Sequence, residues 1–123
     1  MPINTASPQD TYDHMFGSGA TSYSWWQGPT RTTGVDETSK ASDDWSVEVT
    51  CEGEDREDIT KMVNHAAVLK AARKFVQDPP RGSTNMAIQD ARDLVFDADA
   101  CDFDAGTADE LLQFIVLGEV VFC

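Results

Sequence analysis

The chain has 123 residues, and its 22 Asp and Glu against 9 Lys and Arg give a formal net charge of -13. This length accommodates one domain, and the acidity argues against direct nucleic-acid binding through a cationic surface. A hydrophobic content of 41% is too high for a disordered acidic tail. Because no apolar run is long enough to cross a bilayer and the polar N-terminus lacks a signal-peptide pattern, we expect neither a membrane span nor a leader.

The first 35 residues are predicted to form an arm and then a strand. Residues 1–20 are rich in Asn, Ser, Pro and Gly, which favours an irregular N-terminal arm with at most one short turn of helix around residues 8–15. A strand is predicted over 21–35, interrupted at Gly28–Pro29. Its alternation places Tyr23 and Trp25 on one face and Trp26 on the other.

Two further strands follow. A charged loop is predicted over 36–44, and apolar residues then alternate with polar ones from Trp45 to Cys51, as in a half-buried antiparallel strand. Residues 52–58 have the composition of a hairpin loop, and a shorter strand is predicted over 59–63.

The second half of the chain has helical periodicity. The first predicted helix begins at the N-cap Asn64 and ends before Pro79. The second begins after Gly82 with Ser83 or Thr84 as its cap, and an aspartate-rich loop follows over 96–106. The third helix begins at Thr107, is apolar nearly all round and is therefore expected to be buried.

The predicted fold is α+β, with a three-stranded antiparallel sheet followed by three helices in two layers. A single domain is expected over 21–123, with the arm over 1–20. The charge is uneven along it, because segment 61–81 has a net charge of +4 whereas 43–60 and 82–123 have -7 and -8.

The spacing of titratable residues indicates no catalytic or metal site. The aspartates of the 96–106 loop (Asp97, Asp99, Asp102 and Asp104) do not match the EF-hand pattern when it is started at Asp97 or at Asp102. The two histidines (His14 and His65) and three cysteines (Cys51, Cys101 and Cys123) form no close pair of the kind that zinc needs. We therefore predict a non-enzymatic protein without cofactors, with reduced thiols as in the cytoplasm; one disulfide plus a free thiol is the alternative.

Two groups of residues are candidates for contact with a protein partner. Tyr23, Trp25 and Trp26 place large rings on both faces of the first strand, and such rings often anchor interfaces, unless the arm covers them. Lys70, Arg73 and Lys74 form the outer face of the first helix. They either make a positive patch or are paired with the acidic segments.

The chain resembles a group of small acidic proteins of unknown function encoded by phages and prophages of actinobacteria. The resemblance is carried by residues 12–20, by the Trp25–Trp26 pair, and by four short stretches at 96–99, 102–105, 107–110 and 118–119. It implies an accessory protein made inside the host cell. Because the group has no established activity, it assigns no functional residue.

Two functions are expected from these observations. The first is a small acidic binding protein that modulates a host or phage protein. The alternative is a nucleic-acid mimic that inhibits a DNA-binding defence, restriction or transcription protein, because carboxylates can stand where phosphates would. A mimic requires the acidic segments 43–58 and 97–110 to lie on one surface.

Overall fold

A computed structural model of the chain describes residues 3–52 and 57–122. Residues 53–56, in the hairpin loop predicted over 52–58, lie outside the described residues. The elements follow the chain in the order α1 (Pro8–Phe16), η1 (Ala20–Ser22), β1 (Trp26–Val35), β2 (Ala41–Cys51), β3 (Ile59–Asn64), α2 (His65–Gln77), α3 (Asn85–Phe96), η2 (Ala98–Ala100) and α4 (Ala105–Leu117), where η marks a short 3-10 helix.

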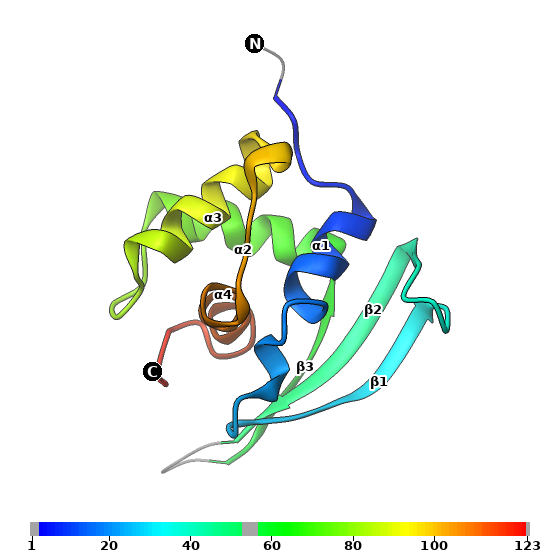
Figure 1. The fold of residues 1–123 in the computed structure, drawn as a ribbon. Helices are drawn as coiled ribbons and strands as arrows, with labels where there is room; N and C mark the ends of the chain where they lie inside the picture. The colour runs from blue at the N-terminus through cyan, green and yellow to red at the C-terminus, as the bar shows by residue number, and fades with distance from the viewer. Residues whose placement is uncertain (1–2, 53–56, 123) are drawn as a thin grey trace.

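The strands form one antiparallel sheet in the order β1-β2-β3, and helices pack on one of its faces (Figure 1). Every second residue of β2 from Trp45 to Cys51 is buried, because this face of the strand meets the helices. The α+β class, the antiparallel sheet and its position before the main helices are thus confirmed. No helix within 3–52 and 57–122 has the length and apolar character needed to cross a membrane.

The described residues contain four α-helices, which corrects the predicted three. The additional helix, α1, lies in the segment expected to be an irregular arm with at most one helical turn. Its start is specified locally: the Ser7 side chain accepts from the Asp10 backbone N–H, and the Asp10 side chain accepts in return from the Ser7 N–H. Pro8 occupies the first helical position, where its missing N–H removes no helical hydrogen bond.

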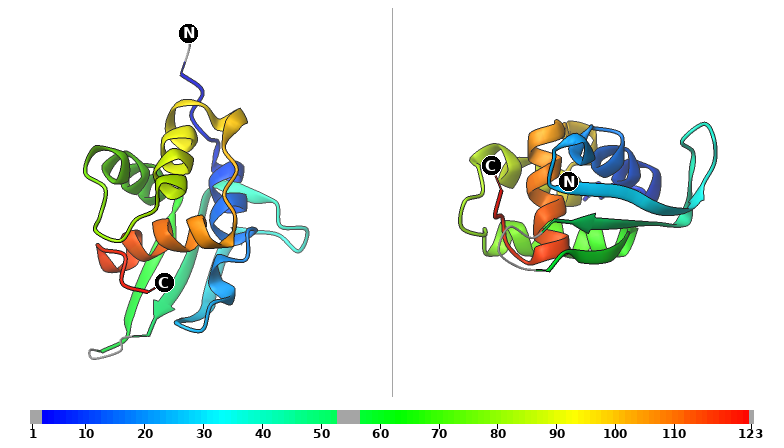
Figure 2. Two further views of the ribbon diagram at one scale, coloured as in Figure 1. Left: turned by 60° about the vertical axis from the view of Figure 1, so that its left-hand side comes forward. Right: turned by 90° about the horizontal axis from the view of Figure 1, so that it is seen from below.

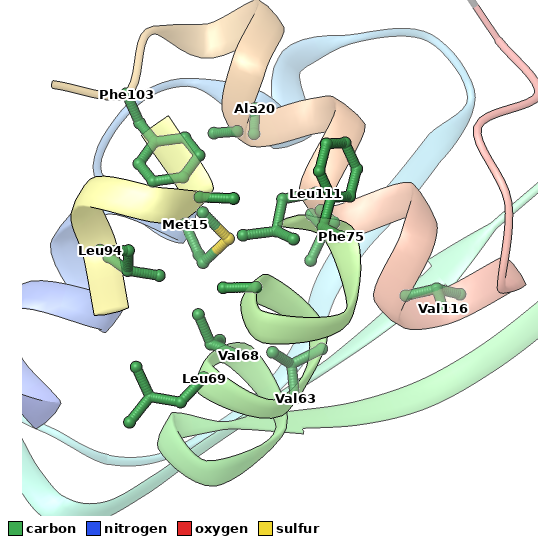
Figure 3. Packing of buried hydrophobic residues seen from close by; sticks show 14 of the residues in the cluster. Met15, Ala20, Val63, Val68, Leu69, Phe75, Leu94, Phe103, Leu111 and Val116 are labelled. Atoms are coloured by element: carbon green, nitrogen blue, oxygen red, sulfur yellow. The ribbon is translucent and has the colours of Figure 1, made fainter. Parts of the chain in front are cut away.

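Helix α1 belongs to the core. The side chain of Met15 is fully buried, and it points toward residues of α2 and α4 such as Phe75 and Leu111 (Figure 3). The indole Nε1 of Trp45 in β2 donates to the carbonyl oxygen of Pro8 at 2.7 Å. This bond and the ring contacts of Trp45 fix α1 on the sheet.

Two strand boundaries differ from the prediction. Strand β1 begins at Trp26 rather than at residue 21, because residues 20–22 form η1. Strand β2 begins at Ala41, so the loop between them is shorter than 36–44, and this turn extends beyond the helices (Figure 2). The predicted interruption at Gly28 is present as a register shift between β1 and β2, and Gly28 has a φ of 106°, which favours glycine.

The helix starts are well capped, although one cap differs from the prediction. Asn64 accepts from the N–H of Ala67 as expected, and Thr84 accepts from the N–H of Ala87. The third predicted helix, however, begins before Thr107. Its N-cap is Asp104, which accepts from the Thr107 N–H at 2.8 Å while the Thr107 hydroxyl accepts from the Asp104 N–H.

The N-terminal residues run beside the end of α3. The backbone N–H of Asn4 donates to the carbonyl of Phe96, and that of Ala6 donates to the carbonyl of Leu94. The Thr5 hydroxyl donates to the carbonyl of Val95 at 2.7 Å. Segment 4–6 is thereby fixed to residues that lie about ninety positions later in the chain.

Candidate binding pocket

A pocket of about 300 Å³ opens where the first turn of α4, the start of α3 and the C-terminal segment meet. Aromatic, apolar and acidic side chains line it together. The lining residues are Tyr23, Trp25, Gly82, Thr84, Met86, Asp104, Gly106, Thr107, Asp109, Glu110, Val120 and Phe122. None of these lining residues is Lys, Arg or His.

Three aromatic rings form one side of the pocket as a continuous stack. The ring centroids of Tyr23 and Trp25 lie 4.9 Å apart, and the two ring planes are inclined by 4°. Trp25 and Phe122 lie 5.1 Å apart with planes 7° from parallel. The stack therefore joins the segment before β1 to the C-terminal segment, and Trp25 is its middle ring.

A buried carboxylate, Asp109, holds this stack in place. Its Oδ1 accepts from the indole Nε1 of Trp25 at 2.8 Å and from that of Trp26 at 2.6 Å. Its Oδ2 accepts from Nε2 of Gln113 at 2.8 Å. Three donors around a side chain that is only 4% exposed match an ionised carboxylate, which can only accept.

Gln113 extends this network to the C-terminal segment. Its Oε1 accepts from the backbone N–H groups of Val121 and Phe122, both at 2.9 Å, and its Nε2 also donates to the Phe122 carbonyl. A chain of hydrogen bonds thus runs from the two indoles through Asp109 to the backbone that carries the third ring. The pocket wall is fixed by buried polar bonds at both ends.

Two further carboxylates at the pocket are held by helix starts. Asp104 caps α4, as described above. Glu110 accepts from the backbone N–H and from the hydroxyl of Thr84, both at 2.7 Å, and Thr84 is the N-cap of α3. Both acids are therefore held in position beside the aromatic stack.

Burial raises the pKa of Asp109 above its ordinary value, although its bonds to Trp25, Trp26 and Gln113 act in the opposite direction. A raised folded-state pKa means that the native chain binds this proton more tightly than the unfolded chain does. Asp109 should therefore make stability fall as pH rises from about 4 through the raised pKa.

We expect urea unfolding across this pH range to show a steeper downward slope for the wild type than for Asp109→Asn, which lacks the titrating group. Equal slopes in the two proteins would contradict a raised pKa at Asp109.

Only two of the six predicted contact residues line the pocket. Tyr23 and Trp25 line the pocket, whereas Trp26 is 6% exposed and its ring belongs to the core. The predicted alternation of Trp25 and Trp26 on opposite strand faces is wrong, because residues 23–25 precede β1. Both indoles instead reach the same carboxylate oxygen.

The three basic candidates lie elsewhere. Lys70, Arg73 and Lys74 are exposed on α2, and Lys74 lines a separate depression with Asp78 and Phe114. Within the described part of the chain, none of the three forms a salt bridge.

Cys101 lies in surroundings that suppress its reactivity. Burial first, and then the carboxylates of Asp90, Asp93 and Asp102, raise the pKa of its thiol to about 12.

At about pH 8 we expect iodoacetamide to modify Cys101 ~1000-fold more slowly in the native chain than in urea. Mass spectrometry of the peptide that carries Cys101 measures both rates. Comparable rates in the native chain and in urea would contradict the raised pKa of the thiol.

The described residues contain no group of three or more His, Cys, Asp and Glu side chains arranged to hold a metal ion. The four aspartates predicted in the 96–106 loop are spread along this segment: Asp97 and Asp99 belong to the cap and body of η2, Asp104 caps α4, and Asp102 lies between the two helices.

Asp109 and Gln113 are the functional residues that sequence reasoning missed. Neither residue was among the candidates named from the sequence. A signal was present: α4 is apolar nearly all round, so two polar residues one turn apart on it had to find buried partners. The indole N–H groups of Trp25 and Trp26 were the donors that lacked an assigned acceptor.

Comparison with known proteins adds no further assignment. No protein-family model, no curated protein and no solved structure matches the chain.

Proposed function

We propose that the protein is a small, non-enzymatic accessory protein of a phage or prophage, which acts in the host cytoplasm by binding and modulating a host or phage protein. The observation that carries this proposal is the pocket beside the Tyr23–Trp25–Phe122 stack. Preformed pockets with aromatic walls and a few fixed polar groups are typical binding sites.

The exposure of the pocket residues supports a role in contact with another molecule. Met86 is 65% exposed and Tyr23 is 36% exposed, so an apolar surface at the pocket remains open to a partner. The carboxylates there are engaged as fixed acceptors: Asp104 caps α4 and Glu110 binds Thr84. Such a rigid arrangement favours recognition over proton transfer.

The nucleic-acid mimic receives less support from the placement of the acidic segments. The acidic segments are only partly on one surface: Trp25 links Glu52 to Asp109, but the end of β2 and the short helix η2 lie at opposite ends of the molecule (Figure 1; Figure 2, left). A mimic needs both acidic segments on one surface, spaced like the phosphates of a duplex. Salt dependence separates the two functions, because binding to a DNA-binding protein through carboxylates should weaken steeply at high salt.

Affinity purification with matched variants tests the proposal. The wild type and three variants are used as bait in lysate of the organism that encodes the chain, and the retained proteins are quantified by mass spectrometry. Met86→Ala removes an exposed side chain from the pocket, and Gly106→Leu fills it. Met62→Ala is the control, because Met62 is 48% exposed on β3 and does not line the pocket.

We expect one or a few proteins to be retained by the wild type and by Met62→Ala, and to be depleted with both pocket variants. Circular dichroism verifies that each variant is folded. Equal recovery of the same proteins with all four baits would overturn the pocket as the contact site.

A further inference from the structure

We infer that the pocket receives the guanidinium group of an arginine side chain presented by the partner protein. This inference rests on the proposed function and names the chemistry that the same site recognises. It follows from the charge, the fixed acceptors and the aromatic walls of the pocket taken together.

The charge of the lining favours a cation. Asp104, Asp109 and Glu110 contribute three carboxylates, and the lining contains no basic side chain. The partial positive charges at the N-termini of α3 and α4, about half a charge each, offset only part of these three negative charges, so the pocket remains negative. Arg81, the nearby cation, lies in a neighbouring depression with Glu119 rather than in this lining.

The acceptors are in place before a ligand arrives. One oxygen of Asp104, Oδ1, accepts from the Thr107 N–H, and no described donor bonds to the other, Oδ2. Asp104 is exposed, so Oδ2 is available to a donor from outside. Both Glu110 oxygens are fixed by Thr84 and each retains a second lone pair. Fixing these groups beforehand lowers the entropic cost of binding.

The apolar walls fit the remainder of an arginine side chain. Tyr23 and Phe122 are the two ends of the stack, so their outer faces, which no other described ring covers, point in opposite directions, and a single guanidinium can stack on one of them. Guanidinium groups stack on aromatic faces, and the methylene stem contacts apolar surface such as Met86 and Val120. A planar guanidinium also matches carboxylate oxygens better than an ammonium does, which favours arginine over lysine.

A small probe tests this chemistry without the partner. N-acetyl-arginine amide is titrated into the whole chain at constant ionic strength, and the Trp25 indole N–H and the Gly106 amide are followed by NMR. N-acetyl-citrulline amide is the neutral isostere and N-acetyl-lysine amide is the ammonium control. We expect saturable shifts with the arginine probe, and binding at least ~10-fold weaker with citrulline, since charge-assisted bonds are lost.

A matched pair of variants tests whether the carboxylate that attracts the arginine probe lies in the pocket. Asp104→Asn keeps a good N-cap for α4 and removes one carboxylate, so stability should change little while arginine binding weakens ~5- to 10-fold. Asp99→Asn makes the same charge change at an exposed residue outside the pocket and should leave binding unchanged. Gly106→Leu should abolish binding, because a side chain there starts 3.6 Å from the Tyr23 hydroxyl oxygen.

The outcomes separate this inference from the proposed function. Equal binding of arginine and citrulline probes, or equal losses in Asp104→Asn and Asp99→Asn, would overturn the arginine assignment even if a partner is captured through the pocket. Tighter binding of the lysine probe would overturn the choice of guanidinium. Arginine binding without any pocket-dependent partner would overturn the proposed function and leave the ligand chemistry standing.

Discussion

Replacing Asp109 with alanine should lower the free energy of unfolding by about 3–5 kcal/mol, because it leaves buried donors without an acceptor. The Trp26 indole N–H is buried, and the Trp25 indole N–H and the Gln113 amide lose the same acceptor. Urea unfolding monitored by tryptophan fluorescence measures the change. We expect the native emission to shift as well, since both indoles lose a charged neighbour.

Asp109→Asn distinguishes the charge from the shape of this group. Its Oδ1 can still accept from the two indoles, but its amide would face Nε2 of Gln113, so two donors would meet. Gln113 cannot flip freely, because its Oε1 already accepts from the N–H groups of Val121 and Phe122. Asn is therefore expected to be destabilising, though less so than Ala. A loss below about 1 kcal/mol in both variants would contradict the network.

Replacing Trp45 with alanine should cost about 3–5 kcal/mol, since it removes a large, fully buried ring. The ring packs edge-on against Tyr12 and Phe16 of α1, with centroids 5.5 and 5.8 Å away. It also supplies the hydrogen bond to the Pro8 carbonyl. Urea unfolding measures the loss, and hydrogen exchange should show that the amides of α1 lose protection most.

Trp45→Phe serves as the control. Phenylalanine retains most ring contacts and loses the bond from Nε1, so a smaller loss of about 1–2 kcal/mol is expected. If Trp45→Ala left the exchange of α1 amides unchanged, α1 would not be docked through this residue.

Local patterns predicted the elements whose partners lie close in sequence. The period of two from Trp45 to Cys51 identified β2, because alternation reflects one dry face and one wet face. Asn64 and Pro79 bounded α2 through rules that act within one helical turn. The apolar surface of α4 correctly indicated its burial.

The features that the sequence did not predict depend on contacts between residues that are far apart in the chain. Asp109 lies 83 and 84 positions from the two indoles that it binds, so nothing near it in sequence revealed that it is buried. Helix α1 was hidden by the turn-forming composition of residues 1–20. Its capping box was local, but helices owe most of their stability to tertiary packing, here on Trp45 and around Met15, which composition does not report.

The pairing of segment 4–6 with the end of α3 also has a consequence for the order in which the chain folds as it is made. Residues 4–6 are synthesised about ninety residues before their hydrogen-bond partners at residues 94–96. At about 5–20 residues per second, this delay is roughly 5–20 s. The elements that cover α1 are completed one after another, the sheet at residue 64, α2 at residue 77 and α4 at residue 117, so the apolar surface of Met15 is not fully covered until α4 has been made. A nascent chain that lacks α4 therefore still exposes apolar surface of α1 to which chaperones can bind.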